Sequence, residues 1–393
     1  MAARGRSAVV AGAGIGGLTA AVALRRQGWH VTVLERARTL EPVGAGLALA
    51  PNALHALDVI GLGAGVRRLS AVQGRGGLRR PNGRWLVRTD LSALTARFGD
   101  PQLVALRPEL VELLAAAVPD GALSTGVTVT GLDAGDPGQQ DQNIRVRTSA
   151  GELGADLVVA ADGIGSIIRT ALFPEHPSPE YSGFTAWRFV APAGAGPVEC
   201  AETWGRGAVF GTAPLADGRV YCYASAAESP GERHDDEAAA LKRRFGGWHD
   251  PIPGLIGSIS PAQVLHDDVY WMARPLPAYH RGRVALLGDA AHAMTPHLGQ
   301  GACQAIEDAV VLAAVAATPP GLAAYTSARM SRTRMVADAS YRTSRLTGMT
   351  SRPAIALRNA GVRLAGHLAP ALMIRPLDRI AGWAPPASIP AAT

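Results

Sequence analysis

A glycine-rich turn near the start of the chain limits its possible folds more than any other feature. Residues 7–11 (SAVVA) are an apolar run, and Gly12, Gly14 and Gly17 follow at the GxGxxG spacing before an alanine-rich, helical pattern. The first glycine permits a tight turn, the second lets a pyrophosphate approach the backbone, and the third lets helix and strand pack closely. The pattern therefore predicts a nucleotide-binding, doubly wound α/β domain. The other residues of the turn expected to contact the phosphates are Ala13, Ile15 and Gly16.

A carboxylate stands where such a fold binds a ribose. Residues 29–34 (WHVTVL) are expected to form the second strand, and Glu35 comes at its end. An acid about 20 residues beyond the glycines accepts hydrogen bonds from ribose hydroxyls. Glu35 therefore supports nucleotide binding, but it does not separate FAD from NAD, because both carry an adenosine ribose.

Two further acids each follow a short run of apolar, β-type residues. Asp162 follows residues 156–161, and Asp289 follows residues 284–288. In an open parallel sheet, ligands bind at the carboxyl ends of the strands, which is where both acids are expected to lie. Taken singly, either acid is also compatible with an aspartate that caps the following helix.

The glycine-rich turn, the segment that leads to Asp162 and the segment that leads to Asp289 occur in this order and at characteristic separations. Together they resemble the fingerprints of single-component (group A) FAD-dependent aromatic-ring monooxygenases. The matching patterns extend to about residue 345. The resemblance implies that Asp289 hydrogen-bonds the ribitol chain of FAD, and that Asp162 supports the pyrophosphate region and the passage used by the nicotinamide cofactor. The contexts of Trp187-Arg188 and residues 299–301 are most similar to the salicylate-hydroxylase-like and zeaxanthin-epoxidase-like branch.

The resemblance also implies contacts along the rest of the cofactor. The N–H groups at the start of the helix after Gly299, Gln300 and Gly301 are expected to face the N1–C2=O edge of the flavin, where they and the helix dipole favour the anionic reduced state. Pro296 is expected to shape the loop beside the reacting edge, as a catalytic position. Arg107 is expected to lie against FAD, with an exposed arginine at a helix start as the alternative. The remaining implied cofactor contacts are Ala302, Ala48, Arg36 at the adenosine and Val129 at the adenine.

The middle of the chain predicts a second domain. Segments 183–190, 199–204, 208–213 and 219–226 are short and separated by turn residues, which indicates an antiparallel sheet. Residues 77–91, with a turn at 81–83, are expected to join it, and residues 134–143 are expected to form a hairpin tip elsewhere. The expected fold is an α/β, para-hydroxybenzoate-hydroxylase-like FAD-binding domain with a smaller antiparallel-sheet domain. The expected boundaries are 1–70, 99–178 and 268–345 for FAD binding, 71–98 and 179–267 for the substrate-binding sheet, and 346–393 for a C-terminal helical segment.

One face of the predicted sheet is a candidate for the substrate site. The period of two places Tyr221 and Tyr223 on one face, and Val209 is assigned to the same face on the preceding strand. In the resembled fold, one face covers the substrate, and we assign substrate binding to these three residues and a catalytic role to Tyr221. A sheet core is the alternative, and the opposite face carries Val220, Cys222 and Ala224.

Composition limits the functional classes. The 393 residues, 48% hydrophobic and 18% charged, suffice for two compact domains, and no apolar run approaches the roughly 20 residues of a membrane span. Three cysteines without paired spacing favour a reducing cytoplasm over disulfides or a metal site. His292 and His297 lack the spacing of a zinc pair and are expected to be structural or to line the pocket.

The net charge of +6 does not predict a nucleic-acid partner. Lys242 is the only lysine, and the excess of arginine, alanine, glycine and proline is typical of a GC-rich genome. The densest basic cluster is expected to be either a solvated helix face or an attractor for the phosphates of a nicotinamide cofactor. Its members are Arg329, Arg332, Arg334, Arg342, Arg345 and Arg352.

Together, these expectations predict a specific enzymatic activity. The resemblance implies an NAD(P)H- and FAD-dependent monooxygenase that hydroxylates a small aromatic or heteroaromatic substrate with O2 through a C4a-hydroperoxyflavin. FAD is expected to be non-covalent, NADPH slightly preferred over NADH, and the protein a monomer or homodimer. The alternatives are an epoxidase of an alkene natural product and a non-catalytic protein that binds flavin and an aromatic ligand. A flavin halogenase fits less well, because Lys242 lies in a surface-helix pattern and no Trp-x-Trp-x-x-Pro motif is present.

Overall fold

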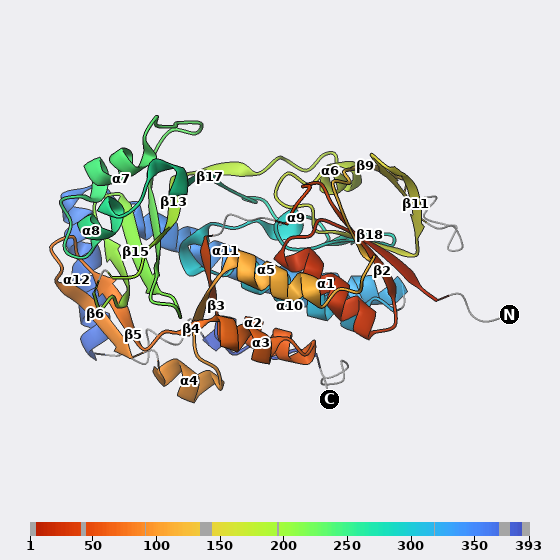
Figure 1. The fold of residues 1–393 in the computed structure, drawn as a ribbon, viewed down its shortest axis with the longest axis horizontal. Helices are drawn as coiled ribbons and strands as arrows, with labels where there is room; N and C mark the ends of the chain where they lie inside the picture. Colours follow the sequence, from red (N-terminus) through yellow and green to blue (C-terminus); the bar gives the residue numbers. More distant parts are fainter. Residues whose placement is uncertain are drawn as a thin grey trace.

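The chain forms two sheet-based regions at opposite ends of an elongated molecule (Figure 1). The structure is a computed structural model that describes residues 5–40, 45–90, 92–133, 144–194, 196–317, 319–368 and 378–386. Within these residues, none of the helices combines the length and the apolar character needed to cross a bilayer.

The region at the N-terminal end is built on a mostly parallel six-stranded sheet. Its order is β18–β19–β12–β1–β2–β8, and only β18 runs antiparallel to its neighbour. The central strands are apolar without alternation because both faces are buried. The bounds are β1 Ser7–Ala11, β2 His30–Glu35, β8 Leu123–Thr125, β12 Leu157–Ala160, β18 His280–Arg281 and β19 Val284–Leu286.

Helices and a small sheet surround this parallel sheet. Helices α1 and α10 pack against each other, and α11 packs on α10. The helices of this region are α1 Ile15–Arg26, α2 Pro51–Val59, α3 Gly63–Leu69, α5 Arg107–Ala116, α6 Ile167–Leu172, α9 Asp289–His292, α10 Gly301–Val315 and α11 Pro319–Thr347; α4 is Ser92–Phe98. A three-stranded sheet is formed by β9 Val129–Asp133, β10 Ile144–Thr148 and β11 Gly151–Ala155. The expected hairpin tip at 134–143 lies outside the described residues.

The predicted antiparallel sheet is present with seven strands. Its order is β17–β13–β16–β15–β14–β5–β6, and only β14 and β5 are parallel. The hairpin expected around the turn at 81–83 is the pair β5 and β6. The bounds are β5 Arg75–Arg79, β6 Trp85–Asp90, β13 Glu180–Ala191, β14 Cys200–Trp204, β15 Ala208–Pro214, β16 Val220–Ala227 and β17 Leu265–Trp271. Strand β17 runs across the expected domain boundary at residue 268.

The two faces of this sheet have different neighbours. The outer face packs Phe210, Cys222 and Ala224 against α7 (Glu237–Phe245) and α8 (Ile252–Gly257). The inner face packs Tyr221 against Val104 and neighbouring residues of a small sheet that joins the two regions. That sheet consists of β3 Gly46–Leu49, β4 Ala71–Val72 and β7 Leu103–Leu106. The inner face therefore looks toward the nucleotide-binding region.

Helix α12 (Arg352–Leu368) supplies the expected C-terminal helical segment, and it packs against β6. Figure 1 shows it at the end of the molecule that carries the antiparallel sheet. It therefore covers part of the sheet instead of forming a separate tail.

The arginine cluster of α11 is not a solvated face throughout. Arg329 is fully buried, donates from Nε to Asp308 at 2.6 Å and pairs with Glu307. Arg332 donates from Nε to the same Glu307 at 2.6 Å. The expectation of a solvated face is wrong for these two residues, because α10 presents two buried acids to them. Arg342 is exposed, as expected.

Candidate active site

The glycine turn has the geometry that its spacing predicts. Gly12 has a φ of +103°, and a Cβ there would lie 2.3 Å from the Ala161 carbonyl oxygen. A Cβ on Gly17 would lie 1.9 Å from the Gly12 carbonyl oxygen, so strand and helix meet at van der Waals distance only with glycine. A Cβ on Gly14 would meet nothing within 4 Å. The turn thus leaves an open face beside Gly14, at the N-terminus of α1, where a diphosphate can approach the N–H groups.

Glu35 is held against this turn. Its Oε2 accepts a hydrogen bond from the Ala13 N–H at 2.8 Å, and its Oε1 accepts one from the Ala37 N–H at 2.8 Å. The Val127 N–H donates to the Glu35 carbonyl at 2.9 Å, which brings the segment leading to Val129 alongside. Arg36 is exposed next to Glu35. The structure therefore gathers the residues that the resemblance assigns to the adenosine half of FAD.

Asp162 lies at the end of β12 with half of its carboxylate unused. Its Oδ2 accepts the Ile167 N–H at 3.1 Å, whereas its Oδ1 is buried and has no hydrogen-bond partner among the described residues. Burial raises the pKa of Asp162, although the hydrogen bond from Ser166 acts in the opposite direction. An orphaned carboxylate oxygen at the end of a sheet strand suits a ligand with donor groups.

Asp289 opens α9 at the end of the neighbouring strand β19. Its side chain is solvent-accessible, yet the surrounding protein raises its pKa, and the charges of His292 and Arg107 only partly offset that rise. Arg107 begins α5, and its N–H donates to Ala45 at 3.0 Å. Asp289 and Arg107, far apart in sequence, therefore share one side of the site.

The loop before α10 packs against strand β3. It contains the 3-10 turn Pro296–Leu298, with Pro296 exposed, and Gly299 at a φ of +62°. A Cβ on Gly299 would lie 3.3 Å from the Ala48 Cβ, so Ala48 lies directly behind the loop. Ala302 follows in the first turn of α10.

The side chain of Gln300 turns into the protein. Its Oε1 accepts a hydrogen bond from Asn52 Nδ2 at 3.1 Å and one from Gln304 Nε2 at 3.2 Å. Any contact of Gln300 with a flavin therefore comes from its backbone, in line with the expectation that N–H groups at the start of α10 face the ring.

The inner face of the sheet reaches this loop through Tyr221. A Cβ on Gly46 would lie 2.4 Å from the Tyr221 ring, so the ring rests on the backbone of β3. Two residues further along β3, Ala48 touches Gly299. Tyr221 is 8% exposed, and its hydroxyl makes no side-chain hydrogen bond within the described part of the chain. The ring of Tyr223 lies 5.7 Å away between centroids.

Val209 shares the face of the two tyrosines. It is opposite Ser225 in the β15–β16 register, while Gly211 is opposite Tyr223. The three residues expected to bind substrate are therefore brought together, and the opposite-face residues Cys222 and Ala224 belong to the outer core.

Sequence reasoning missed a residue that supports the Gly288–Asp289 turn. Asp308 Oδ2 accepts the Gly288 N–H at 3.0 Å and pairs with His292 Nε2 at 2.5 Å. Burial opposes ionisation of Asp308, but His292 and Arg329 outweigh it and lower the pKa to about 2. The sequence did carry a signal for this residue: the acid pair 307–308 lies inside an otherwise apolar helix, and buried acids require partners. His292 is thus structural, while His297 contacts Phe184 edge-on at 5.5 Å.

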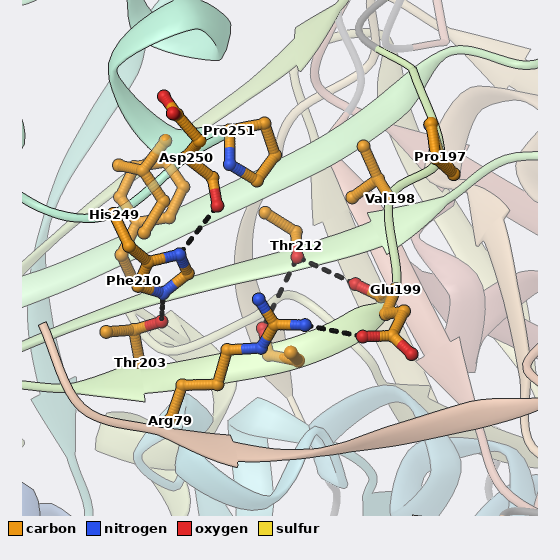
Figure 2. A pocket seen from close by; sticks show the side chains of 12 residues that line it. Arg79, Pro197, Val198, Glu199, Thr203, Phe210, Thr212, His249, Asp250 and Pro251 are labelled. Carbon is orange, nitrogen blue, oxygen red and sulfur yellow. Dashed lines mark hydrogen bonds and ion pairs between the residues drawn. The ribbon is translucent and has the colours of Figure 1, made fainter. Parts of the chain in front are cut away.

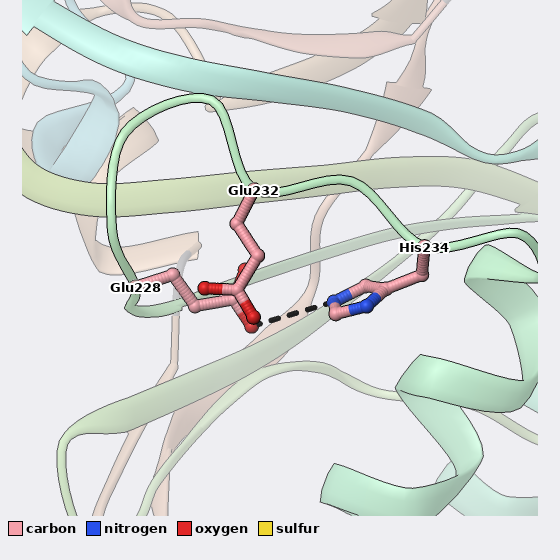
Figure 3. A group of neighbouring side chains, drawn as sticks. All are labelled: Glu228, Glu232 and His234. Carbon is pink, nitrogen blue, oxygen red and sulfur yellow. Dashed lines mark ion pairs between the residues drawn. The ribbon is translucent and has the colours of Figure 1, made fainter.

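Two other features lie away from these residues. Figure 2 shows a cavity of about 370 Å³ on the outer side of the sheet, lined by residues that include Arg79, Glu199 and His249. Figure 3 shows Glu228, Glu232 and His234, whose ligand-type atoms lie within 4.8 Å of one another. Arg244 Nη1 lies 2.7 Å from Glu228, so this group is an ion-pair cluster in the structure.

The open face beside Gly14, the orphaned oxygen of Asp162 and the accessible carboxylate of Asp289 fit an extended dinucleotide such as FAD. Comparison with known proteins decides the family. A family model described as FAD binding domain matches residues 6–340. The chain belongs to the class A flavin monooxygenases.

The monooxygenase resembles curated enzymes and solved structures over most of its length. It is 39% identical over 346 residues to the aurachin C monooxygenase/isomerase of Stigmatella aurantiaca, a match that covers 86% of this chain and 88% of that protein. It is 32% identical over 371 residues to the 2-heptyl-3-hydroxy-4(1H)-quinolone synthase of Pseudomonas aeruginosa, covering 91% and 93%. The structure of Klebsiella pneumoniae HpxO complexed with FAD and uric acid matches with a TM-score of 0.87 at 27% identity, covering 96% and 97%.

These findings confirm the family and the fold expected from the sequence. The protein is an FAD-dependent monooxygenase.

Replacing Asp289 with alanine in this monooxygenase is expected to weaken FAD binding more than replacing Asp162. A hydrogen bond to a charged group contributes roughly 1.5–3 kcal/mol, on the order of tenfold or more in affinity. The Asp162→Ala variant is instead expected to slow flavin reduction by NAD(P)H. FAD titration of the apoproteins and anaerobic stopped-flow reduction measure both effects, with the exposed Asp120→Ala as control. Equal flavin loss with equal reduction rates in the two variants contradicts the assignment.

Proposed function

We propose that the monooxygenase hydroxylates a small phenol or nitrogen heteroaromatic ring held between the inner face of the antiparallel sheet and the flavin loop. The observation that carries this proposal is the contact path from Tyr221 through Gly46 and Ala48 to Gly299. Strand β3 thus contacts both a buried phenol and the loop that precedes α10. The names of similar proteins support the ring type, since one makes a 4-quinolone and another is complexed with uric acid.

The side chains around this path suit an apolar ring with few polar substituents. Val104, Leu106 and Ala45 pack with Tyr221, and such apolar walls exclude water from the reacting edge. When bound, FAD reduced by NAD(P)H would activate O2, so that one oxygen atom is transferred to the ring and the other leaves as water. The hydroxyl of Tyr221 orients a polar substituent of the substrate, while Val209 and Tyr223 line the same face. Pro296 shapes the loop opposite them.

The electron donor in this proposal is NAD(P)H, with NADPH slightly preferred. Arg342, Arg345 and Arg352 are exposed at the end of α11 and the start of α12, where they can attract an additional phosphate. We also propose a cytoplasmic monomer or homodimer, because this compartment supplies NAD(P)H and keeps thiols reduced. The described cysteines are free.

A panel of phenols, quinolones and purines tests the proposal. The holoenzyme is mixed with NADPH and each compound, and both NADPH oxidation and product mass are measured. The expected result is ligand-stimulated oxidation with a product that carries one added oxygen atom. If no aromatic compound stimulates oxidation and an alkene does, the proposed ring hydroxylation is wrong.

A further inference from the structure

A carboxylate on the inner face of the sheet is held by two neutral donors. Tyr223 Oη donates to Glu202 Oε1 at 2.8 Å, and Trp204 Nε1 donates to Glu202 Oε2 at 2.9 Å. Glu202 lies opposite Gly211 on β15, which lies opposite Tyr223 on β16. Glu202 therefore shares the face of Tyr221.

Gly211 makes this contact between non-adjacent strands possible. A Cβ at Gly211 would lie 2.0 Å from the Tyr223 ring. The ring therefore lies flat across β15 and reaches the carboxylate on β14. Any side chain at residue 211 would displace Tyr223 and break this arrangement.

No cation neutralises Glu202 within the described part of the chain. Two arginines of this sheet have other partners: Arg79, on the adjacent strand β5, pairs with Glu199, and Arg188, opposite Tyr223 on β13, pairs with Asp267. Burial raises the pKa of Glu202, and the hydrogen bonds from Trp204 and Tyr223 only partly offset this. A desolvated carboxylate without a cation is unfavourable unless further donors reach it.

The carboxylate has spare acceptor capacity, and the residue that carries it is partly exposed. A carboxylate offers about four lone-pair sites, and the hydrogen bonds from Tyr223 and Trp204 use two. Glu202 and Tyr223 are both partly exposed although they lie on the inner face. Trp204 is buried, with the Arg358 guanidinium 5.4 Å from its ring centroid, so its N–H is fixed toward Glu202. The geometry leaves the free lone pairs for a ligand.

We propose that Glu202, positioned by Tyr223 and Trp204, recognises an N–H group of a nitrogen heteroaromatic substrate and disfavours aromatic carboxylates. This inference rests on the proposed function, which places the substrate on the same face. A ring N–H or amino group supplies the donor that the carboxylate lacks. A substrate carboxylate would bring a second negative charge beside Glu202, which is unfavourable in a desolvated site.

Three probes of similar shape separate these contributions. 4-Hydroxyquinoline presents an N–H in its quinolone form, 1-naphthol is its carbon analogue, and 1-hydroxy-2-naphthoate adds a carboxylate. Dissociation constants are measured from the change in flavin absorbance of the oxidised holoenzyme, without turnover. We expect 4-hydroxyquinoline to bind on the order of tenfold more tightly than 1-naphthol, and the naphthoate to bind most weakly.

Glu202→Gln is expected to remove this discrimination while retaining FAD. The amide keeps the shape but not the charge, so 4-hydroxyquinoline should lose on the order of tenfold in affinity and the naphthoate should gain. Tyr223→Phe should also weaken 4-hydroxyquinoline binding, because it removes the hydrogen bond that positions the Glu202 carboxylate. Glu175→Gln, an exposed residue beyond α6, is the matched control and should leave all three constants unchanged.

Two results overturn the inference. The first is that the wild-type enzyme binds 4-hydroxyquinoline no more tightly than 1-naphthol. The second is that the Glu202→Gln enzyme keeps the preference for 4-hydroxyquinoline. Either result leaves the proposed function intact if an aromatic compound still stimulates NADPH oxidation with oxygen transfer. Loss of that stimulation across the whole panel contradicts the proposed function itself.

Discussion

Replacing Arg329 with methionine is expected to lower the free energy of unfolding by about 3–5 kcal/mol, because it removes the buried cation that Glu307 and Asp308 share. Arg329 is fully buried between Glu307 and Asp308, and its Nη2 donates to Gln304 Oε1 at 2.8 Å. Methionine has a similar length but no donor. Denaturant unfolding of FAD-loaded protein, followed by far-UV circular dichroism, measures the change.

Arg342→Met is the matched control for this prediction. Arg342 lies on the same helix but is exposed, so its replacement should change the unfolding free energy by no more than about 0.5 kcal/mol. Equal stability of the Arg329 and Arg342 variants contradicts the account of the buried cluster.

Asp308 makes the cluster sensitive to acid. Its pKa is lowered from an ordinary value of 3.8 to about 2, because the charges of His292 and Arg329 outweigh the effect of burial. A group with a lowered folded-state pKa stabilises the protein fully above its unfolded-state pKa. The contribution of Asp308 is therefore complete above about pH 4 and is lost as the pH falls toward 2.

Tyr221→Phe is expected to leave the FAD content unchanged. It should lower the rate of oxygen transfer to the substrate on the order of a hundredfold, and with it the product yield per NAD(P)H. The ring that carries the Tyr221 hydroxyl rests on the backbone of β3, the strand that also contacts the flavin loop through Ala48. Losing an orienting contact allows a displacement of about 1 Å, which can cost on the order of a hundredfold in rate. Hydrogen peroxide should make up the difference. Product, NAD(P)H and peroxide are quantified in the same reaction.

Two comparisons check this second prediction. Tyr223→Phe should also reduce coupling, while Tyr270→Phe on β17, where the residue is 40% exposed, should have no effect. Unchanged coupling in both inner-face variants would place the substrate on the other face, beside Val220, Cys222 and Ala224.

The sequence predicted those features that depend on local spacing. The turn was predictable because Gly12, Gly14 and Gly17 each occupy a backbone position that a side chain would obstruct or that a ligand must approach. The period of two correctly placed Tyr221 and Tyr223 on the same face of the sheet. The acids at the strand ends were also predictable, because the carboxyl ends of parallel strands lie along one edge of the sheet.

Features that depend on packing between distant elements were not predictable in this way. The burial of Arg329 follows from the pairing of α11 with α10, which a cluster of arginines does not reveal. The contact between Tyr223 and Glu202 requires the registers of three strands and the absence of a side chain at Gly211. The inward orientation of Gln300 depends on Asn52, which lies 248 residues away in the sequence.

Oxygen isotope labelling tests the central claim most directly. The FAD-loaded protein is incubated with NADPH, an aromatic substrate that stimulates oxidation, and isotopically labelled dioxygen in unlabelled water. The account predicts that the product contains one labelled oxygen atom on its ring and that the wild-type enzyme forms little peroxide. A product that takes its oxygen from water, or no oxygenated product from any aromatic compound, would contradict it.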